Sequence, residues 1–239
     1  LAYALQQIVV VPAFPSFQHD FHASATWTAW VYTGFLLVSS VATPILSRLG
    51  DQFGRRRLLV ISLLLFLAGS LLAIGAWDIW SLIVARSIQG FGGAILPLSF
   101  ALVRDHFPPQ KVPQALSGIS MVFGISAPIG LLAAGPIIEH LSWRYLFVLG
   151  AAGMVVAAVL VHRFIPESEV RAQQRIDLPG AALLTGTLVA LLVALTEANH
   201  WGWLGARTLG LAALSLVLAA WWFRVEARSE APLVDLRML

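Results

Sequence analysis

The sequence predicts an all-α, polytopic membrane protein in which apolar helices are joined by short polar segments. Hydrophobic residues make up 59% of the 239 residues, charged residues make up 11%, and the mean hydropathy is +0.83. Soluble domains contain about 25% charged residues. Uncharged segments from Trp27 to Leu46 and from Leu58 to Trp77 are each long enough to cross a hydrocarbon core about 30 Å thick.

The composition also excludes several classes of function. The chain contains no cysteine, which excludes a disulfide framework and thiol-based metal sites. No His-x-x-x-His motif or carboxylate cluster indicates a metal site, and no nucleophile–base pair or phosphate loop indicates an enzyme. The basic residues flank apolar segments, as membrane orientation requires, so they do not indicate nucleic-acid binding. We therefore expect no catalytic residue, metal or cofactor.

A charged segment from Ser47 to Arg57 separates the first two long apolar runs. Its three consecutive arginines cannot enter lipid, and Gly54 permits the positive φ of a sharp turn, so the segment is expected to form a tight cytoplasmic loop. It resembles the signature loop of the major facilitator superfamily, G-x-L-a-D-r-x-G-r-k, with Leu49, Asp51, Gly54, Arg55 and Arg56 on pattern and Ser47 replacing the first glycine. A generic basic loop would explain the arginines but not the spacing of Asp51 and Gly54.

This resemblance implies a charge cluster at the cytoplasmic end of the bundle. Asp51 and Arg55 are four residues apart, and Asp105 ends the fourth predicted span at the same membrane face. The three side chains are expected to latch the second and fourth spans and to favour the outward-facing state. Exposed ion pairs contribute only about 0 to 1 kcal/mol, so the latch should bias a conformational equilibrium and not hold the fold.

The first predicted span, about Leu1 to Pro15, carries a glutamine pair, Gln6 and Gln7. It resembles the first helix of 14-span drug:proton antiporters, D-x-T-I-V-N-V-A-L-P-x-I, but Gln6 stands where that pattern has its aspartate. This predicted span therefore carries no acid that could bind a coupled proton. The pair is expected to hydrogen-bond either a ligand or a neighbouring helix.

The fourth predicted span, about Ser81 to Val103, contains a charge deep in the membrane, Arg86. A central arginine costs about 2.5 to 3.5 kcal/mol on insertion, which the apolar residues of the span offset. Arg86, Gln89, Gly90 and Gly93 recur at helical spacing and should share the face that points into the bundle. The run resembles the motif R-x-x-Q-G-x-G, which implies proton coupling or substrate binding; the alternative is an arginine that joins helices by bonding carbonyls.

The fifth predicted span, about Val112 to Ile138, is rich in small residues. Such residues allow helices to approach closely, and an internal proline loosens the helical hydrogen bonds. The span resembles the antiporter motif G-x-x-x-G-P-x-x-G-G in a degenerate form, which predicts a helix-packing role for Gly124, Pro128, Gly130, Ala134 and Gly135.

The order of spans predicts four regions. Residues 1–162 should form a six-helix facilitator bundle, residues 163–177 a cytoplasmic linker, residues 178–223 two additional membrane helices, and residues 224–239 a cytoplasmic tail that leads to a second bundle. Two extra helices after the sixth span resemble the insertion of the 14-span drug:proton antiporters.

The charge distribution predicts the orientation, because basic residues concentrate on the cytoplasmic side and tryptophans mark interfaces. Of the 15 basic residues, those predicted to be cytoplasmic are Arg48, Arg55, Arg56, Arg57, Arg104, Lys111, Arg163, Arg171, Arg175, Arg224, Arg228 and Arg237. Arg144 and Arg207 fall at predicted outer ends, as do Trp27, Trp30, Trp77, Trp80, Trp143, Trp201 and Trp203. We expect a multi-pass protein of the cell membrane with eight spans and both ends cytoplasmic.

The function implied by the resemblance is proton-coupled export of drugs or other amphipathic small molecules. The partners would be the lipid bilayer, the substrate, protons and a C-terminal half that completes the transporter, because a single bundle supplies half of a cavity wall. Two alternatives remain open: a truncated membrane fragment that does not transport, and a facilitator for a polar solute that uses Gln6, Gln7 and Arg86.

Overall fold

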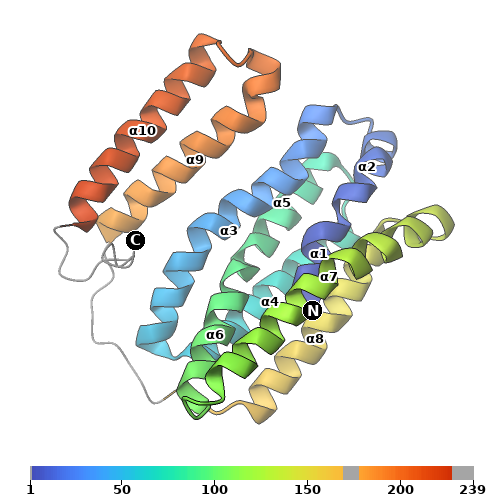
Figure 1. Cartoon of the computed structure of the whole chain (residues 1–239). Helices are drawn as coiled ribbons and strands as arrows, with labels where there is room; N and C mark the ends of the chain where they lie inside the picture. Colours follow the sequence, from blue (N-terminus) through green and yellow to red (C-terminus); the bar gives the residue numbers. More distant parts are fainter. Residues whose placement is uncertain (1, 169–177, 228–239) are drawn as a thin grey trace.

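The computed structural model describes residues 2–168 and 178–227, and every regular element in this part of the chain is a helix (Figure 1). Seven helices or helix stacks in these ranges are long and apolar enough to cross a membrane. They are α3 (Ala25–Phe53), α4 (Arg55–Ile74), the stack of α5 (Ile79–Gln89), η2 (Gly90–Ala94) and α6 (Ile95–His106), α7 (Val112–His140), α8 (Arg144–Phe164), α9 (Leu178–Trp201) and α10 (Ala206–Glu226). The all-α membrane-bundle prediction is therefore confirmed.

The first predicted span is broken in the structure. It consists of α1 (Ala2–Val9), the 3₁₀ turn η1 (Val11–Ala13) and α2 (Phe14–Phe21). Pro12 lies in the first turn of η1 and Pro15 in the first turn of α2, where a missing N–H costs little. The expected end at Pro15 was wrong because this proline lies in the first turn of a helix, and α2 continues to Phe21.

The predicted loop from Ser47 to Arg57 is mostly helical, which corrects the sequence interpretation. Helix α3 continues to Phe53 and α4 begins at Arg55, so the turn consists of Gly54 alone, with φ of 113°. A charged helix end needs no break to reach water, because it can simply extend beyond the hydrocarbon core. Within this segment, Gly54 alone takes a backbone conformation that side chains disfavour.

The fourth predicted span also contains a local break. An Asp78–Ser81 capping box starts α5, with the Ser81 N–H donating to Asp78 Oδ1 at 2.7 Å. The helix changes to 3₁₀ geometry at Gly90 and resumes as α6 at Ile95. A Cβ atom at Gly93 would lie 2.2 Å from Ser39 Oγ, so this glycine-rich turn lets the stack approach α3 closely.

Two clusters of buried side chains hold the bundle together. In one, Trp143 is 2% exposed and packs edge-on against Phe17, with ring centroids 5.0 Å apart, and against Phe147, at 6.0 Å. In the other, Phe66 of α4 lies among apolar residues of α3, α6 and α8, including Leu98 and Met154. The first cluster fixes the broken N-terminal segment against α8.

The two C-terminal membrane helices form a hairpin beside α3 (Figure 1). Contacts between α3 and α9 include a hydrogen bond from Thr196 Oγ1 to Thr33 Oγ1 at 3.3 Å. Helix α9 runs to Trp201 and α10 begins at Ala206, so residues 202–205 form the turn between them. The predicted linker is described only to Ser168; residues 169–177 and the tail residues 228–239 lie outside the described residues.

Candidate functional site

The centre of the candidate site is Arg86 of α5, whose side chain is fully buried. Its Nη1 donates to Gln89 Oε1 at 2.5 Å, and its guanidinium lies 4.4 Å from the centroid of the Phe35 ring. The helical spacing predicted this pairing with Gln89. Arg86 Nε and Nη2 are buried without a hydrogen-bond partner, and in residues 2–168 and 178–227 no carboxylate forms an ion pair with Arg86.

A chain of polar side chains connects Arg86 to α1. Gln89 Nε2 donates to Ser70 Oγ of α4 at 2.7 Å. Ser70 Oγ is 3.4 Å from Gln6 Oε1, and it also donates to the Phe66 carbonyl at 2.9 Å. Gln6 is 2% exposed, and its Nε2 has no partner among the described residues. Three helices therefore contribute to one buried hydrogen-bond chain, which we call the Arg86 chain: Arg86, Gln89, Ser70 and Gln6.

The far end of the Arg86 chain reaches a cavity. Gln6 is the single polar side chain in the wall of a pocket of about 310 Å³ between α1, α7 and α8. A Cβ atom at Gly150 would lie 1.9 Å from Gln6 Oε1, so the absence of a side chain at Gly150 makes room for the amide. Gln7 is half-buried and takes no part in these hydrogen bonds, so the structure separates the predicted glutamine pair.

This arrangement is energetically demanding. Burying a charge without an opposite charge costs several kcal/mol, on the order of the cost of breaking a buried ion pair, and neutral amides offset only part of it. Buried N–H groups are almost always paired with protein or water. The unpaired donors of Arg86 and Gln6 are therefore suited to hold water or a ligand acceptor. The glycine-rich turn after Gln89 brings the α5–η2–α6 stack close to α3 and α4.

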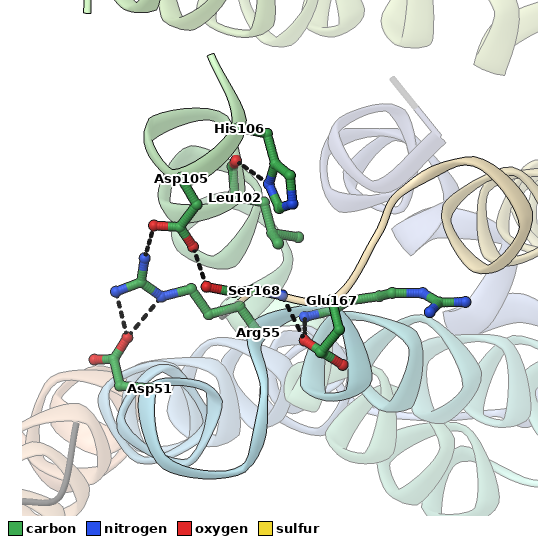
Figure 2. Close-up of polar contacts among 8 residues, drawn as sticks. Asp51, Arg55, Leu102, Asp105, His106, Glu167 and Ser168 are labelled. Carbon is green, nitrogen blue, oxygen red and sulfur yellow. Dashed lines mark hydrogen bonds and ion pairs between the residues drawn. The ribbon is translucent and has the colours of Figure 1, made fainter. Parts of the chain in front are cut away.

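A second candidate site lies at the end of the bundle that carries the signature motif (Figure 2). Arg55 binds Asp51 through Nη2 at 2.8 Å and Asp105 through Nη1 at 2.5 Å. The structure thus brings together the three residues predicted for the latch. Their side chains are 18%, 30% and 11% exposed, so this charge cluster is more shielded from solvent than an ordinary surface ion pair.

Two residues that sequence reasoning missed complete the charge cluster. Ser168 Oγ donates to Asp105 Oδ2 at 2.6 Å (Figure 2). The Glu167 carboxylate accepts hydrogen bonds from the backbone N–H groups of Arg56, at 2.9 Å, and Arg57, at 3.2 Å. Glu167 therefore caps α4, where a negative charge complements the helix dipole. A Cβ at Gly54 would lie 2.7 Å from this carboxylate, which gives Gly54 a second reason to lack a side chain.

Arg56 has a role distinct from that of Arg55. Its Nη2 donates to the backbone carbonyl of His162 and also contacts His162 Nδ1 at 3.3 Å. This contact ties the start of α4 to the last turn of α8, where a cation is favourable. The only hint in the sequence was that a proline, a glutamate and a serine follow the sixth span, from Pro166 to Ser168.

The helix-packing motif is only partly supported. Gly130 and Ala134 are buried, and a Cβ at Gly130 would contact Val9 Cγ2 of α1 at 3.0 Å. Around Gly124 and Gly135, in contrast, a Cβ would meet no described atom within 4 Å, and Pro128 is exposed. In the described residues these three positions lie on faces of α7 that pack against no helix, so their helix-packing role stays a prediction; α7 remains continuous through Pro128.

The described residues contain no group of three or more His, Cys, Asp or Glu side chains placed to bind a metal ion. The polar chemistry of this part of the chain lies instead in the Arg86 chain and the charge cluster.

Comparisons with known proteins agree on the family. A profile of the Major Facilitator Superfamily matches residues 1–182. The chain is 33% identical over 241 residues to the tetracenomycin C resistance and export protein of Streptomyces glaucescens, which covers 98% of this chain and 44% of that protein. It is 32% identical over 212 residues to multidrug resistance protein 3 of Bacillus subtilis (strain 168), which covers 88% of this chain and 41% of that protein. The chain thus spans less than half the length of these curated relatives.

The fold has counterparts among solved structures. The human organic anion transporter MFSD10 (TETRAN) superimposes with a TM-score of 0.60 over 82% of this chain and 54% of that chain, at 16% sequence identity. The POT family transporter PepTSo superimposes with a TM-score of 0.58 over 92% of this chain and 50% of that chain, at 13% identity. At this identity the likeness concerns the fold alone.

Proposed function

We propose, because this chain belongs to the Major Facilitator Superfamily, that it forms part of a proton-coupled exporter of drugs or similar amphipathic small molecules. Its relatives are resistance and export proteins, while its length covers less than half of theirs. A facilitator of this kind moves its substrate by rocking two bundles about a central site. In our proposal residues 1–162 are one such bundle, residues 178–223 are two added helices, and a C-terminal half completes the cavity.

The observation that carries this proposal is the Arg86 chain. A buried cation within a membrane span is costly and generally marks a pathway for substrates or ions. Here the cation leads through Gln89 and Ser70 to Gln6, which lines a cavity. The hydrogen-bond chain therefore provides a polar connection from the interior of α5 to a pocket beside α1.

The chemistry of Arg86 limits its role in proton coupling. A guanidinium stays protonated at physiological pH, so Arg86 cannot itself release the transported proton. Gln6, in the position of the expected acid, cannot titrate either. We propose that Arg86 holds water or an anionic substrate group and lowers the pKa of a carboxyl that approaches it. That carboxyl would be contributed by the C-terminal half, because Glu197 accepts a hydrogen bond from Trp30 Nε1 at 2.8 Å and lies in a different pocket.

A second candidate function, a facilitator for a polar solute, draws support from Gln6. Its Nε2 is a buried donor without a partner and belongs to the wall of the 310 Å³ pocket. A neutral amide with a free N–H suits a carbonyl or hydroxyl acceptor. This candidate predicts that solute moves down its own gradient and that an imposed proton gradient changes neither its rate nor its direction.

Arg86→Ala in the full natural protein is expected to abolish proton-driven efflux. Arg86→Lys should restore it only partly, because an ammonium lacks the planar fork that holds Gln89 and further acceptors. The measurement is dye efflux in everted membrane vesicles under an imposed proton gradient. Lys111→Ala, which removes an exposed cation at the end of the bundle, is the matched control and should transport normally.

The variants must be present in the membrane at wild-type abundance for this comparison. Efflux that persists in Arg86→Ala with unchanged pH dependence would leave Arg86 a role in helix packing only. Transport of the same dye that ignores the proton gradient in the wild type would favour the facilitator.

A further inference from the structure

A second, larger pocket lies between α3, α5 and α9. It is separate from the pocket between α1, α7 and α8 that Gln6 lines. Its volume is about 610 Å³, within the range of roughly 300 to 1,000 Å³ that small-molecule sites occupy. It is built where the C-terminal hairpin meets the rest of the bundle, and Figure 1 shows α9 beside α3 at this junction. None of the residues of the Arg86 chain lines it.

The wall of this pocket is aromatic. Four tryptophans from three helices line it: Trp27 and Trp30 of α3, Trp80 of α5 and Trp201 of α9. The rings of Trp27 and Trp80 lie 4.2 Å apart between centroids, so they form one continuous surface. They are 39% and 53% exposed, which leaves ring area free for a ligand. Tryptophans that only anchor a helix at the membrane interface can each contact the lipid headgroups separately. These four side chains instead line one pocket.

A carboxylate lies among these rings. Glu197 of α9 lines the pocket, and its Oε1 accepts a hydrogen bond from Trp30 Nε1 at 2.8 Å. This bond fixes the carboxylate across the junction of α3 and α9. Within residues 2–168 and 178–227, no side chain donates to Oε2 and no cation forms an ion pair with Glu197. One oxygen of the carboxylate is therefore available to a ligand.

The other charged or titratable groups nearby are His200 and Arg207. His200 lines the pocket, while Arg207 is not part of its wall. The guanidinium of Arg207 lies 5.9 Å from the centroid of the Trp201 ring, within the distance at which a cation is attracted to an aromatic face. One ring of the cluster thus already contacts a cation, and the rings of Trp27 and Trp80 present the same kind of surface without one.

We propose that this pocket binds a monovalent, amphipathic organic cation. Its charge would lie beside Glu197, and its aromatic or alkyl groups would lie against Trp27 and Trp80. Indole faces attract cations, and a carboxylate adds a direct Coulomb term that an anion or a neutral molecule cannot use. The site is separate from the Arg86 chain, so the proposal does not rest on proton-coupled export.

Equilibrium binding of radiolabelled tetraphenylphosphonium tests this proposal. The natural protein would be purified into nanodiscs of phosphatidylglycerol, which carries no cationic headgroup. Glu197→Gln is expected to weaken the affinity about tenfold, because it removes the Coulomb attraction, and Trp80→Ala about threefold, because it removes one cation–aromatic contact. Arg86→Ala should retain the Glu197-dependent binding, which separates this site from the proposed transport pathway.

The matched control variants change residues of the same types, Glu and Trp, that do not line the pocket. Glu139→Gln neutralises another exposed carboxyl, and Trp77→Ala removes a tryptophan that is 81% exposed; both should bind the cation within twofold of wild type. Neutral triphenylphosphine oxide should bind weakly and show no dependence on Glu197.

Three results would overturn the proposal. The first is unchanged affinity in a folded Glu197→Gln variant, which would leave the tryptophans as an interfacial belt only. The second is Glu197-independent binding of the cation and the neutral compound alike. The third is disappearance of the affinity difference between wild type and Glu197→Gln when phosphatidylethanolamine replaces phosphatidylglycerol, which would assign the pocket to an ammonium headgroup; the change in membrane surface charge affects both proteins equally.

Discussion

Asp20 is the residue that ties the broken N-terminal segment to the bundle. Its Oδ2 accepts a hydrogen bond from Trp143 Nε1 at 2.8 Å, and Trp143 is buried against Phe17. The bond from Trp143 holds the pKa of Asp20 below its ordinary value of 3.8, with a smaller contribution from His19. A lowered pKa means that the native state favours the ionised carboxylate.

The stability that Asp20 contributes should therefore be present above pH 3.8 and be lost as the pH falls through the lower native pKa. Asn cannot titrate, so we expect the melting temperature of Asp20→Asn to be unaffected by this protonation. The difference in melting temperature between wild type and Asp20→Asn should therefore shrink as the pH falls from about 5 to about 3. The measurement is thermal unfolding followed by tryptophan fluorescence at a series of pH values. A difference between Asp20→Asn and wild type that stays constant over this pH range would refute the linkage.

At the scale of the element, the start of α4 depends on a residue more than a hundred positions away. Glu167 caps the backbone N–H groups of Arg56 and Arg57 and lies against the Gly54 turn. Removing a side-chain cap costs about 0.5 to 2 kcal/mol. Glu167→Ala should therefore increase the hydrogen-exchange rates of the Arg56 and Arg57 amides about two- to thirtyfold, measured by mass spectrometry of the α3–α4 peptides.

Glu167→Gln is the matched variant for this cap. It retains one acceptor oxygen but no charge, so it should protect the two amides to an intermediate degree. Equal exchange in wild type and Glu167→Ala would show that the first turn of α4 needs no cap from this residue. The Arg55 contacts with Asp51 and Asp105 are separate and should persist in both variants.

At the scale of the whole molecule, the proposed orientation is testable because the chain contains no cysteine. Leu204 lies in the turn between α9 and α10 and is 86% exposed. Leu204→Cys should react with an impermeant thiol reagent in intact cells, because the basic-residue asymmetry places this turn outside. Lys111→Cys, exposed between α6 and α7, should react only after the membrane is permeabilised. The reverse pattern would invert the topology.

The sequence by itself determined the long apolar membrane helices, the polar face of α5 and the family. The lengths of apolar runs and the positions of charges predict membrane spans directly. A helix makes its backbone hydrogen bonds within one segment, and each lipid-facing side chain must be apolar. The helical period placed Gln89 beside Arg86, and the spacing of Asp51 and Arg55 placed those two side chains one turn apart. These are relations between neighbours along the chain, which local geometry fixes.

Tertiary structure alone decided which distant groups meet. Nothing near Gln6 in the chain indicates Ser70, nothing near Gly54 indicates Glu167, and nothing near Trp30 indicates Glu197. It also decided that Gly130 packs against α1 while Gly124 does not. Small residues and tryptophans occur on every side of a membrane helix, so their role depends on which face the packing of the other helices covers, and a single helix does not encode that choice.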